Sequence, residues 1–173
     1  CADFAPQPER PDKPRLLVLT DISNEPDDEE SLVRLLVYSN EFQIEGLVAT
    51  TSTYLRDRTR EDLIRRGVAA YAEVRPNLTK HADDYPTAES LLTVTRTGQN
   101  GFGMAAVSRE GGTPGSQRII DAGDRADSRP LWISVWGGAN TLAQALMDIR
   151  ESRSPDETEA FVSKLRVYAI SDQ

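Results

Sequence analysis

Short, mostly apolar runs that alternate with amphipathic segments constrain the fold of this sequence more than any other feature. The runs cover residues 16–19, 44–50, 131–136 and 165–170. Such runs, bounded by turn residues, are typical of strands buried on both faces of a parallel sheet. The helical segments between them are the expected right-handed crossovers. The pattern therefore predicts an α/β fold, an open and mostly parallel sheet with helices on both faces, similar to Rossmann-like folds.

The chain divides into a Pro-rich start and one α/β domain. Residues 1–14 are polar and rich in proline, which suits a tether. Residues 15–173 are expected to be the N-terminal part of the domain. The last strand runs directly into Ser171, Asp172 and Gln173, at the edge where open α/β sheets bind ligands. We therefore expect a fold that is incomplete at its C-terminus, and the remainder of the domain as a partner on a separate chain.

Several helix boundaries are also marked in the sequence. Ser154, followed by Pro155 and then by Glu157, predicts a capping box, and Pro114 predicts the first residue of another helix. Thr59 before Asp62 predicts the cap of a helix that ends near Val74. Residues 76–113 are rich in glycine and predict loops with one or two short helices. The run 131–136 contains Trp132 and Trp136, which we expect in the core.

Charge and cysteine content exclude several classes of protein. The net charge of −8 and a pI near 4.7 predict an acidic surface, so we expect no nucleic-acid partner. No apolar run approaches the roughly 20 residues of a membrane-spanning helix. With one histidine, His81, which we expect on the surface, and one cysteine, a zinc site is not expected. Cys1 is either an arbitrary start or the lipidated first residue of a mature bacterial lipoprotein. The second interpretation predicts a protein of the bacterial cell envelope, or a secreted one, that contacts a membrane only through this lipid.

Acidic residues crowd into the ten positions that follow the first predicted strand. They are Asp21, Glu25, Asp27, Asp28, Glu29 and Glu30. Carboxylates in the first turn of a helix stabilise its dipole, which accounts for residues 27–30 without any ligand. That explanation leaves out Asp21 at the end of the strand. The alternative is a hard cation bound by oxygen ligands, with Ca²⁺ favoured over Mg²⁺ because it accepts many flexible carboxylates.

The stretch from Leu16 to Asp28 resembles the amino-terminal signature of nucleoside hydrolases, in which an apolar strand leads to an aspartate and an Asp-Asp pair. It is more similar still to an uncharacterised bacterial branch of that superfamily, often labelled cellulose-binding. Further motifs carry this resemblance in the same order; they are 38–42, 46–52, 98–103 and 136–141. The resemblance spans about residues 15–173 and implies a nucleoside-hydrolase-like domain.

The resemblance also implies roles for individual residues. Asp21, Asp28 and the main-chain carbonyl of Trp136 would bind Ca²⁺, and Asp27 would contact a sugar hydroxyl and act as the general base. Substrate contacts would come from three polar residues, which are Asn24, Thr53 and Asn100. The implied reaction is the calcium-dependent hydrolysis of a glycosidic bond in a small sugar or nucleoside, or in a glycan, through an oxocarbenium-like transition state.

Two departures separate this chain from true nucleoside hydrolases. Leu19 stands where they have a further aspartate, and the loop before Asp27 is longer by two residues and contains 24–26 in place of glycine. A non-catalytic carbohydrate-binding module on the same fold is therefore the alternative function. A phosphotransferase with Asp21 as nucleophile ranks last, because Ser23 stands where that chemistry requires a second acid.

Overall fold

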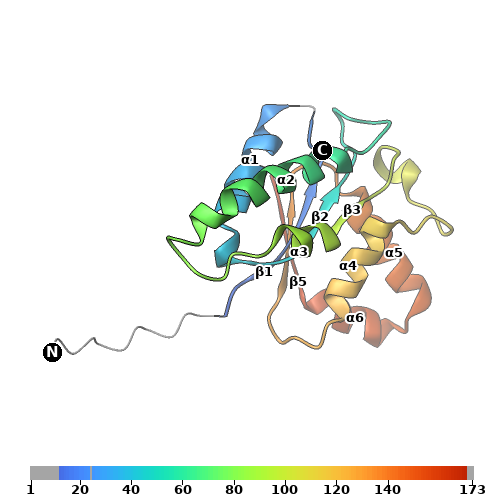
Figure 1. Cartoon of the computed structure of the whole chain (residues 1–173). Helices are drawn as coiled ribbons and strands as arrows, with labels where there is room; N and C mark the ends of the chain where they lie inside the picture. The colour runs from blue at the N-terminus through green and yellow to red at the C-terminus, as the bar shows by residue number, and fades with distance from the viewer. Residues whose placement is uncertain (1–11, 24, 171–173) are drawn as a thin grey trace.

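A computed structural model of the protein describes residues 12–23 and 25–170, so Cys1 and Asn24 lie outside the described residues. Its centre is a sheet of parallel strands in the order β3-β2-β1-β4-β5 (Figure 1). The strands are β1 (Arg15–Thr20), β2 (Gln43–Ala49), β3 (Thr95–Thr97), β4 (Leu131–Val135) and β5 (Leu165–Ala169). The predicted α/β architecture is therefore confirmed.

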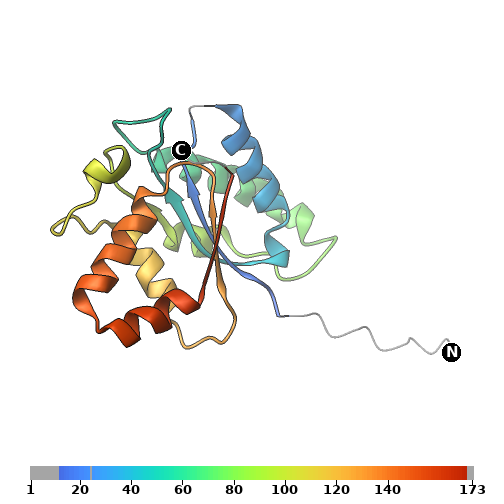
Figure 2. The same cartoon turned by 180° about the vertical axis from the view of Figure 1, so that it is seen from behind.

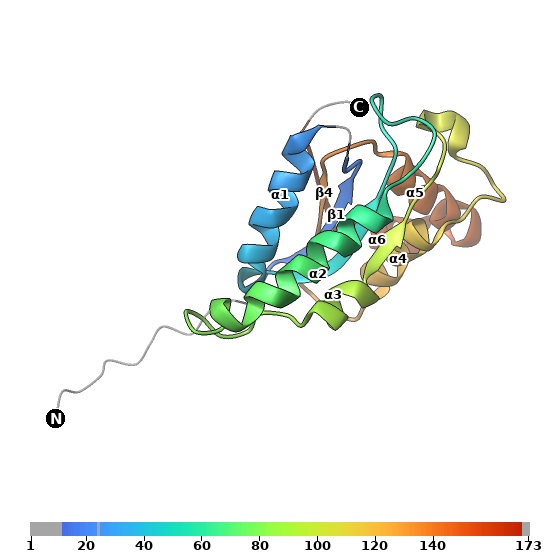
Figure 3. The same ribbon diagram turned by 45° about the horizontal axis from the view of Figure 1, so that its top comes forward.

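Helices cover the sheet on both faces, as Figure 3 shows. One layer contains α1 (Pro26–Val37), α2 (Glu61–Leu78) and α3 (Ala88–Thr93), and the other contains α4 (Pro114–Asp124), α5 (Asn140–Ser152) and α6 (Pro155–Ser163). Short 3₁₀ turns, η1 (Ser39–Glu41) and η2 (Gly103–Ala106), join these elements. Val18 of β1 packs in the α1–α2 core and its neighbours Leu17 and Leu19 pack in the α4–α6 core, as the two-residue period of a strand requires. Within the described residues, no helix has the length and apolar character needed to cross a membrane.

The strand order creates a switch point between β1 and β4. From β1 the chain builds β2 and then β3 on one side, and it then returns past β1 to build β4 and β5 on the other. The connections that leave β1 and β4 therefore run to opposite faces of the sheet. In open α/β sheets this divergence leaves a crevice outside the carboxyl ends of the two strands. The crevice lies where Asp21 and Trp136 follow their strands.

Two of the three helix starts predicted from capping residues are confirmed. The Ser154 side chain accepts from the amide of Glu157, whose carboxylate accepts in return from the Ser154 amide, and α4 begins at Pro114. The predicted Thr59 cap is wrong. Helix α2 begins at Glu61 with no side-chain cap, because the Thr59 hydroxyl bonds instead to Thr97 and to Asn100.

Two parts of the fold differ from the sequence prediction in residues 59–113. Helix α2 continues through Pro76 to Leu78 instead of ending near Val74. Residues 95–97 form the edge strand β3, which was not predicted because Thr-Arg-Thr carries no apolar run. A three-residue strand at an edge needs few apolar side chains, since only one neighbour supports it.

The placement of Trp132 in the core is wrong. Its side chain is 44% exposed, because the face of β4 and β5 that points toward the α1 layer has no helix over it. Tyr168 of β5 shares this face and is 65% exposed. A hollow of about 390 Å³ lies here, lined mainly by apolar side chains that include Leu16 and Phe42. Figure 2 shows β5 as the outermost strand, with this side open.

A buried ionic cluster joins the strands near their amino ends. Arg15, which is fully buried, donates from Nε to Glu45 Oε1 at 2.8 Å and from a terminal nitrogen to the Ala122 carbonyl at 2.5 Å. Arg118 and Arg125 reach the same carboxylate at 3.4 and 3.0 Å. Each buried charge is thus paired, which is the condition for burying charge at tolerable cost.

Candidate functional site

Carboxylates from two elements converge at the switch point between β1 and β4. Asp21 directly follows β1, and Asp28 lies in the first turn of α1, with its side chain turned inward; both residues are 8% exposed. Asp27 and Glu25 lie beside them and are exposed. These carboxylates and Trp136 line one small cavity of about 10 Å³, which has room for about one water-sized particle.

Two hydroxyl groups hold the buried carboxylates. Ser52, in the loop after β2, donates from Oγ to Asp21 Oδ2, and Thr20, the last residue of β1, donates from Oγ1 to Asp28 Oδ2. The Asp28 amide in turn donates to Asp27 Oδ1 at 3.0 Å. Each of the three aspartates is therefore oriented by a hydrogen bond that its carboxylate accepts.

The charge at this site is negative and only partly compensated. The pKa of Asp28 is raised from 3.8 to about 6, chiefly by burial. The Thr20 hydrogen bond opposes this rise, and the charges of Asp21 and Asp27 contribute to it. Carboxylates that crowd in a partly buried crevice either take up protons or bind a cation.

The Gly137-Gly138 turn after β4 is required by the close packing of this crevice. A Cβ atom at Gly137 would lie 2.5 Å from Asp21 Oδ1, and one at Gly138 would lie 2.4 Å from the Thr51 carbonyl oxygen. The turn is tied to β1 by the Trp136 amide, which donates to the Leu19 carbonyl at 2.8 Å. Glycine at both positions lets the β4–α5 connection lie directly against the carboxylates.

The structure brings together four of the site residues predicted from sequence and separates others. Asp21, Asp27, Asp28 and Trp136 share the small cavity. Thr53 and Asn100 are not among its lining residues; Asn100 is exposed and accepts from the Thr59 hydroxyl at 3.1 Å. The prediction for Asn24 lies outside the described residues.

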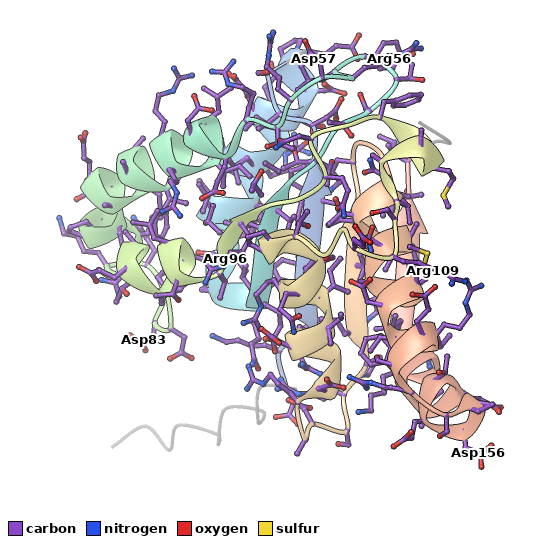
Figure 4. The ribbon with its side chains drawn as sticks, turned by 90° about the vertical axis from the view of Figure 1, so that its right-hand side faces the viewer. Arg56, Asp57, Asp83, Arg96, Arg109 and Asp156 are labelled. Atoms are coloured by element: carbon purple, nitrogen blue, oxygen red, sulfur yellow. The ribbon has the colours of Figure 1, made fainter. Side chains whose placement is uncertain are left out.

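Sequence reasoning missed Ser52 and Thr20. A signal for Ser52 was present in the polar run Thr50-Thr51-Ser52-Thr53, which follows the strand beside β1. The carboxyl ends of adjacent parallel strands meet at one edge, so a hydroxyl at this position reaches Asp21. Figure 4 shows the loop that continues this run, with Arg56 and Asp57 at the top of the molecule.

The donor atoms of this site fit a hard divalent cation. They are carboxylate oxygens, which Ca²⁺ and Mg²⁺ prefer, and two of the carboxylates are buried. Across residues 12–23 and 25–170, no three Asp, Glu, His or Cys side chains are spaced so that they could hold a metal ion between them. An ion at this site would therefore need further oxygen atoms from main-chain carbonyls, water or ligand hydroxyls.

A larger hollow borders the carboxylate cavity. It measures about 430 Å³, lies between α1 and β4, and shares Trp136 with the small cavity. Its other lining residues include Tyr38, Phe42, Arg34 and Glu41. The hollows of about 390 and 430 Å³ are far larger than the carboxylate cavity. The ionisable side chains of the switch point converge at the smaller cavity.

Comparison with known proteins identifies the family of the chain. Residues 15–173 match the family model described as cellulose-binding Sde182, nucleoside hydrolase-like domain. The chain belongs to this family. The match confirms the nucleoside-hydrolase-like fold inferred from the motifs between Leu16 and Thr141.

A solved structure supports the assignment to the Sde182 nucleoside hydrolase-like family. It is that of a nucleoside hydrolase-related hypothetical protein from Saccharophagus degradans, described as associated with carbohydrate metabolism. The two chains are 42% identical with a TM-score of 0.91, and the match covers 93% of this chain and 39% of that chain. This chain therefore corresponds to well under half of the length of that relative. No curated protein matches it.

Proposed function

We propose that this protein binds a divalent cation, Ca²⁺ in preference to Mg²⁺, and hydrolyses a glycosidic bond in a ribosyl compound or a related sugar. The observation that carries the proposal is the convergence of Asp21, Asp27 and Asp28 at the switch point of the sheet, beside the carbonyl-bearing turn after Trp136. Family membership supports it, because the matched domain is described as nucleoside hydrolase-like. The relative's association with carbohydrate metabolism is consistent with a sugar ligand, either a small sugar, a nucleoside or a glycan.

Asp21, Asp28 and the main-chain carbonyl of Trp136 would hold the ion. A bound divalent cation of this kind orients sugar hydroxyls and lowers the pKa of water. The two aspartates suit this role because both are buried and each already has one oxygen fixed by a hydroxyl donor.

Asp27 is the proposed general base. Its Oδ1 accepts from the Asp28 amide at 3.0 Å, which stabilises the carboxylate and leaves Oδ2 for a proton. Asp27 would remove a proton from water as the water oxygen bonds to the anomeric carbon, while the leaving group departs with the electron pair of the glycosidic bond. Exposure of Asp27 at the mouth of the cavity gives it access to a ligand.

The second candidate is a carbohydrate-binding protein without catalytic activity. The family description favours it, since it names a cellulose-binding protein. So does the hollow next to the carboxylates, in which aromatic side chains (Tyr38, Phe42 and Trp136) lie beside the polar groups of Arg34 and Glu41. Aromatic walls with a few polar groups are typical of small-ligand sites.

Calorimetric titration with Ca²⁺, followed by assays for free base and reducing sugar on a panel of nucleosides and glycans, separates the two candidates. For an enzyme, Asp27→Asn lowers the rate of release by about 10²- to 10⁴-fold, the typical contribution of a general base. Asp57→Asn is the matched control, because Asp57 is an exposed carboxylate on the loop after β2 and is not part of the cavity.

The outcomes are distinct. Release of product that depends on Asp27 and not on Asp57 supports the hydrolase. Sugar binding without release from any member of the panel supports the binding protein, and equal activity of the Asp27→Asn variant removes Asp27 from the proposal.

A further inference from the structure

We infer that Ser52 and Thr20 are positioning residues, which set the orientation of the ion-binding carboxylates of Asp21 and Asp28. The inference rests on the proposed function and deepens it, because it names the residues that control the affinity of the site for its ion. It assigns the control to neutral hydroxyl groups, which act through the hydrogen bonds that they donate to the two carboxylates.

The hydrogen bonds that the Ser52 oxygen accepts determine where its hydroxyl proton points. Its oxygen accepts from the amides of Tyr54 at 2.9 Å and Leu55 at 3.2 Å. A serine hydroxyl has two acceptor lone pairs and one proton, so both lone pairs are engaged and the proton goes to Asp21 Oδ2. Ser52 is fully buried, so water does not compete for this bond.

Thr20 repeats the arrangement at the other carboxylate. Its Oγ1 accepts from the Ile22 amide at 3.1 Å and donates to Asp28 Oδ2. Thr20 is 1% exposed. In both cases backbone amides of a turn fix the hydroxyl, and the fixed hydroxyl orients a carboxylate that belongs to a different part of the structure.

The consequence is a site that is organised before any ligand arrives. Each hydroxyl donates to one oxygen of its carboxylate, and the second oxygen takes no part in that hydrogen bond. A carboxylate with a fixed direction loses less conformational freedom when a ligand binds, which increases affinity. A hydrogen bond to a charged group also contributes more than one between neutral groups.

Calcium titration of hydroxyl variants tests the inference. Thr20→Val and Ser52→Ala should each weaken Ca²⁺ binding by about ten- to a hundredfold, the effect of losing one hydrogen bond to a charged group. Thr20→Ser retains the hydroxyl and should bind Ca²⁺ as the unmodified protein does. Thr50→Val is the matched control, since the buried Thr50 hydroxyl lies at the same edge of the sheet and has no hydrogen-bond partner within the described residues.

Circular dichroism in calcium-free buffer identifies the variants that fold. If one of the two hydroxyl variants does not fold, the other still tests the inference. Unchanged affinity in folded Thr20→Val and Ser52→Ala overturns the inference and leaves the proposed ion site intact. Weakening in Thr50→Val to the same degree also overturns it, because the effect would then be one of general packing. Absence of Ca²⁺ binding by the unmodified protein overturns the ion site and the inference together.

Discussion

At the scale of single residues, Asp28 links the stability of the protein to pH. Its pKa is raised from 3.8 to about 6, chiefly by burial. Between these values the folded protein binds a proton that the unfolded chain has released, so stability falls as the pH rises through this window. The shift of about two pKa units corresponds to roughly 3 kcal/mol of unfolding free energy, which is fully present only below the unfolded pKa of 3.8, is lost progressively as the pH rises and is gone above about pH 6.

Urea unfolding at pH 4 and pH 7 in calcium-free buffer measures this effect. The Asp28→Asn variant, which retains an acceptor for Thr20, should show a smaller loss of stability over this range, and the difference between the two proteins isolates the contribution of Asp28. Identical pH profiles would contradict the assignment of the raised pKa.

Gly137 should tolerate no side chain, because its Cα faces the carboxylate of Asp21. Gly137→Ala places a methyl group 2.5 Å from Asp21 Oδ1. We expect a loss of about 1–3 kcal/mol of stability, typical of overpacking. Gly112→Ala is the control, since a Cβ there meets its nearest neighbour at an ordinary 3.5 Å. Thermal unfolding of the two variants compares them directly, and equal midpoints would show that the turn moves to accommodate the methyl group.

At the scale of elements, the ionic cluster at the amino ends of the strands should be the most sensitive polar contact. Glu45→Gln removes the nearer countercharge of the buried Arg15 guanidinium and leaves Asp127 at 3.7 Å, so we expect a loss of about 3 kcal/mol, the lower end of the range for breaking a buried ion pair. Glu151→Gln is the matched control, because Glu151 pairs at 3.0 Å with Arg109, which is 84% exposed. An exposed pair of this kind contributes about 0–1 kcal/mol. Chemical denaturation measures both, and similar losses would contradict the special role of Glu45.

Some strands and helix ends could be predicted from sequence patterns, and others could not. Strands β1 and β4 and the caps at Ser154 and Pro114 were predictable, because apolar runs and capping residues act locally. Strand β3 was not, since it depends on pairing with β2 and not on its own side chains. Val33 of α1 is 60% exposed although it is apolar. Whether such a side chain is covered depends on the packing of distant elements.

The candidate site likewise has features that local sequence predicts and features that depend on distant parts of the chain. The acidic cluster and the position of Asp21 at a strand end predicted that carboxylates would gather, and they do. The contacts of Ser52 and Thr20 required the register between β1 and β2, which pairs Thr20 with Ala49 and places the next loop beside Asp21. The single sequence does not encode that register in any local pattern.

At the scale of the whole molecule, the open face of β4 and β5 is the feature that an optical measurement can follow. The chain has two tryptophans, and Trp132 is 44% exposed whereas Trp136 is partly buried. We expect Trp136→Phe, which retains only Trp132, to emit at longer wavelength and to be quenched readily by acrylamide. Trp132→Phe should show the opposite. Equal quenching of the two variants would indicate that the face over β4 and β5 is covered.

The placement of Asp21, Ser52, Asp28 and the Gly137 turn on separate segments has a thermodynamic consequence. In the unfolded chain Ser52 and Gly137 are far along the polypeptide from Asp21 and Asp28, so the complete crevice exists only in the folded protein and a ligand of the crevice binds that state preferentially. Ligand binding and folding are then linked by mass action, and the folded population grows with ligand concentration. The sheet and its helices thus set the ligand affinity of this protein as directly as the oxygen atoms that would touch the ligand.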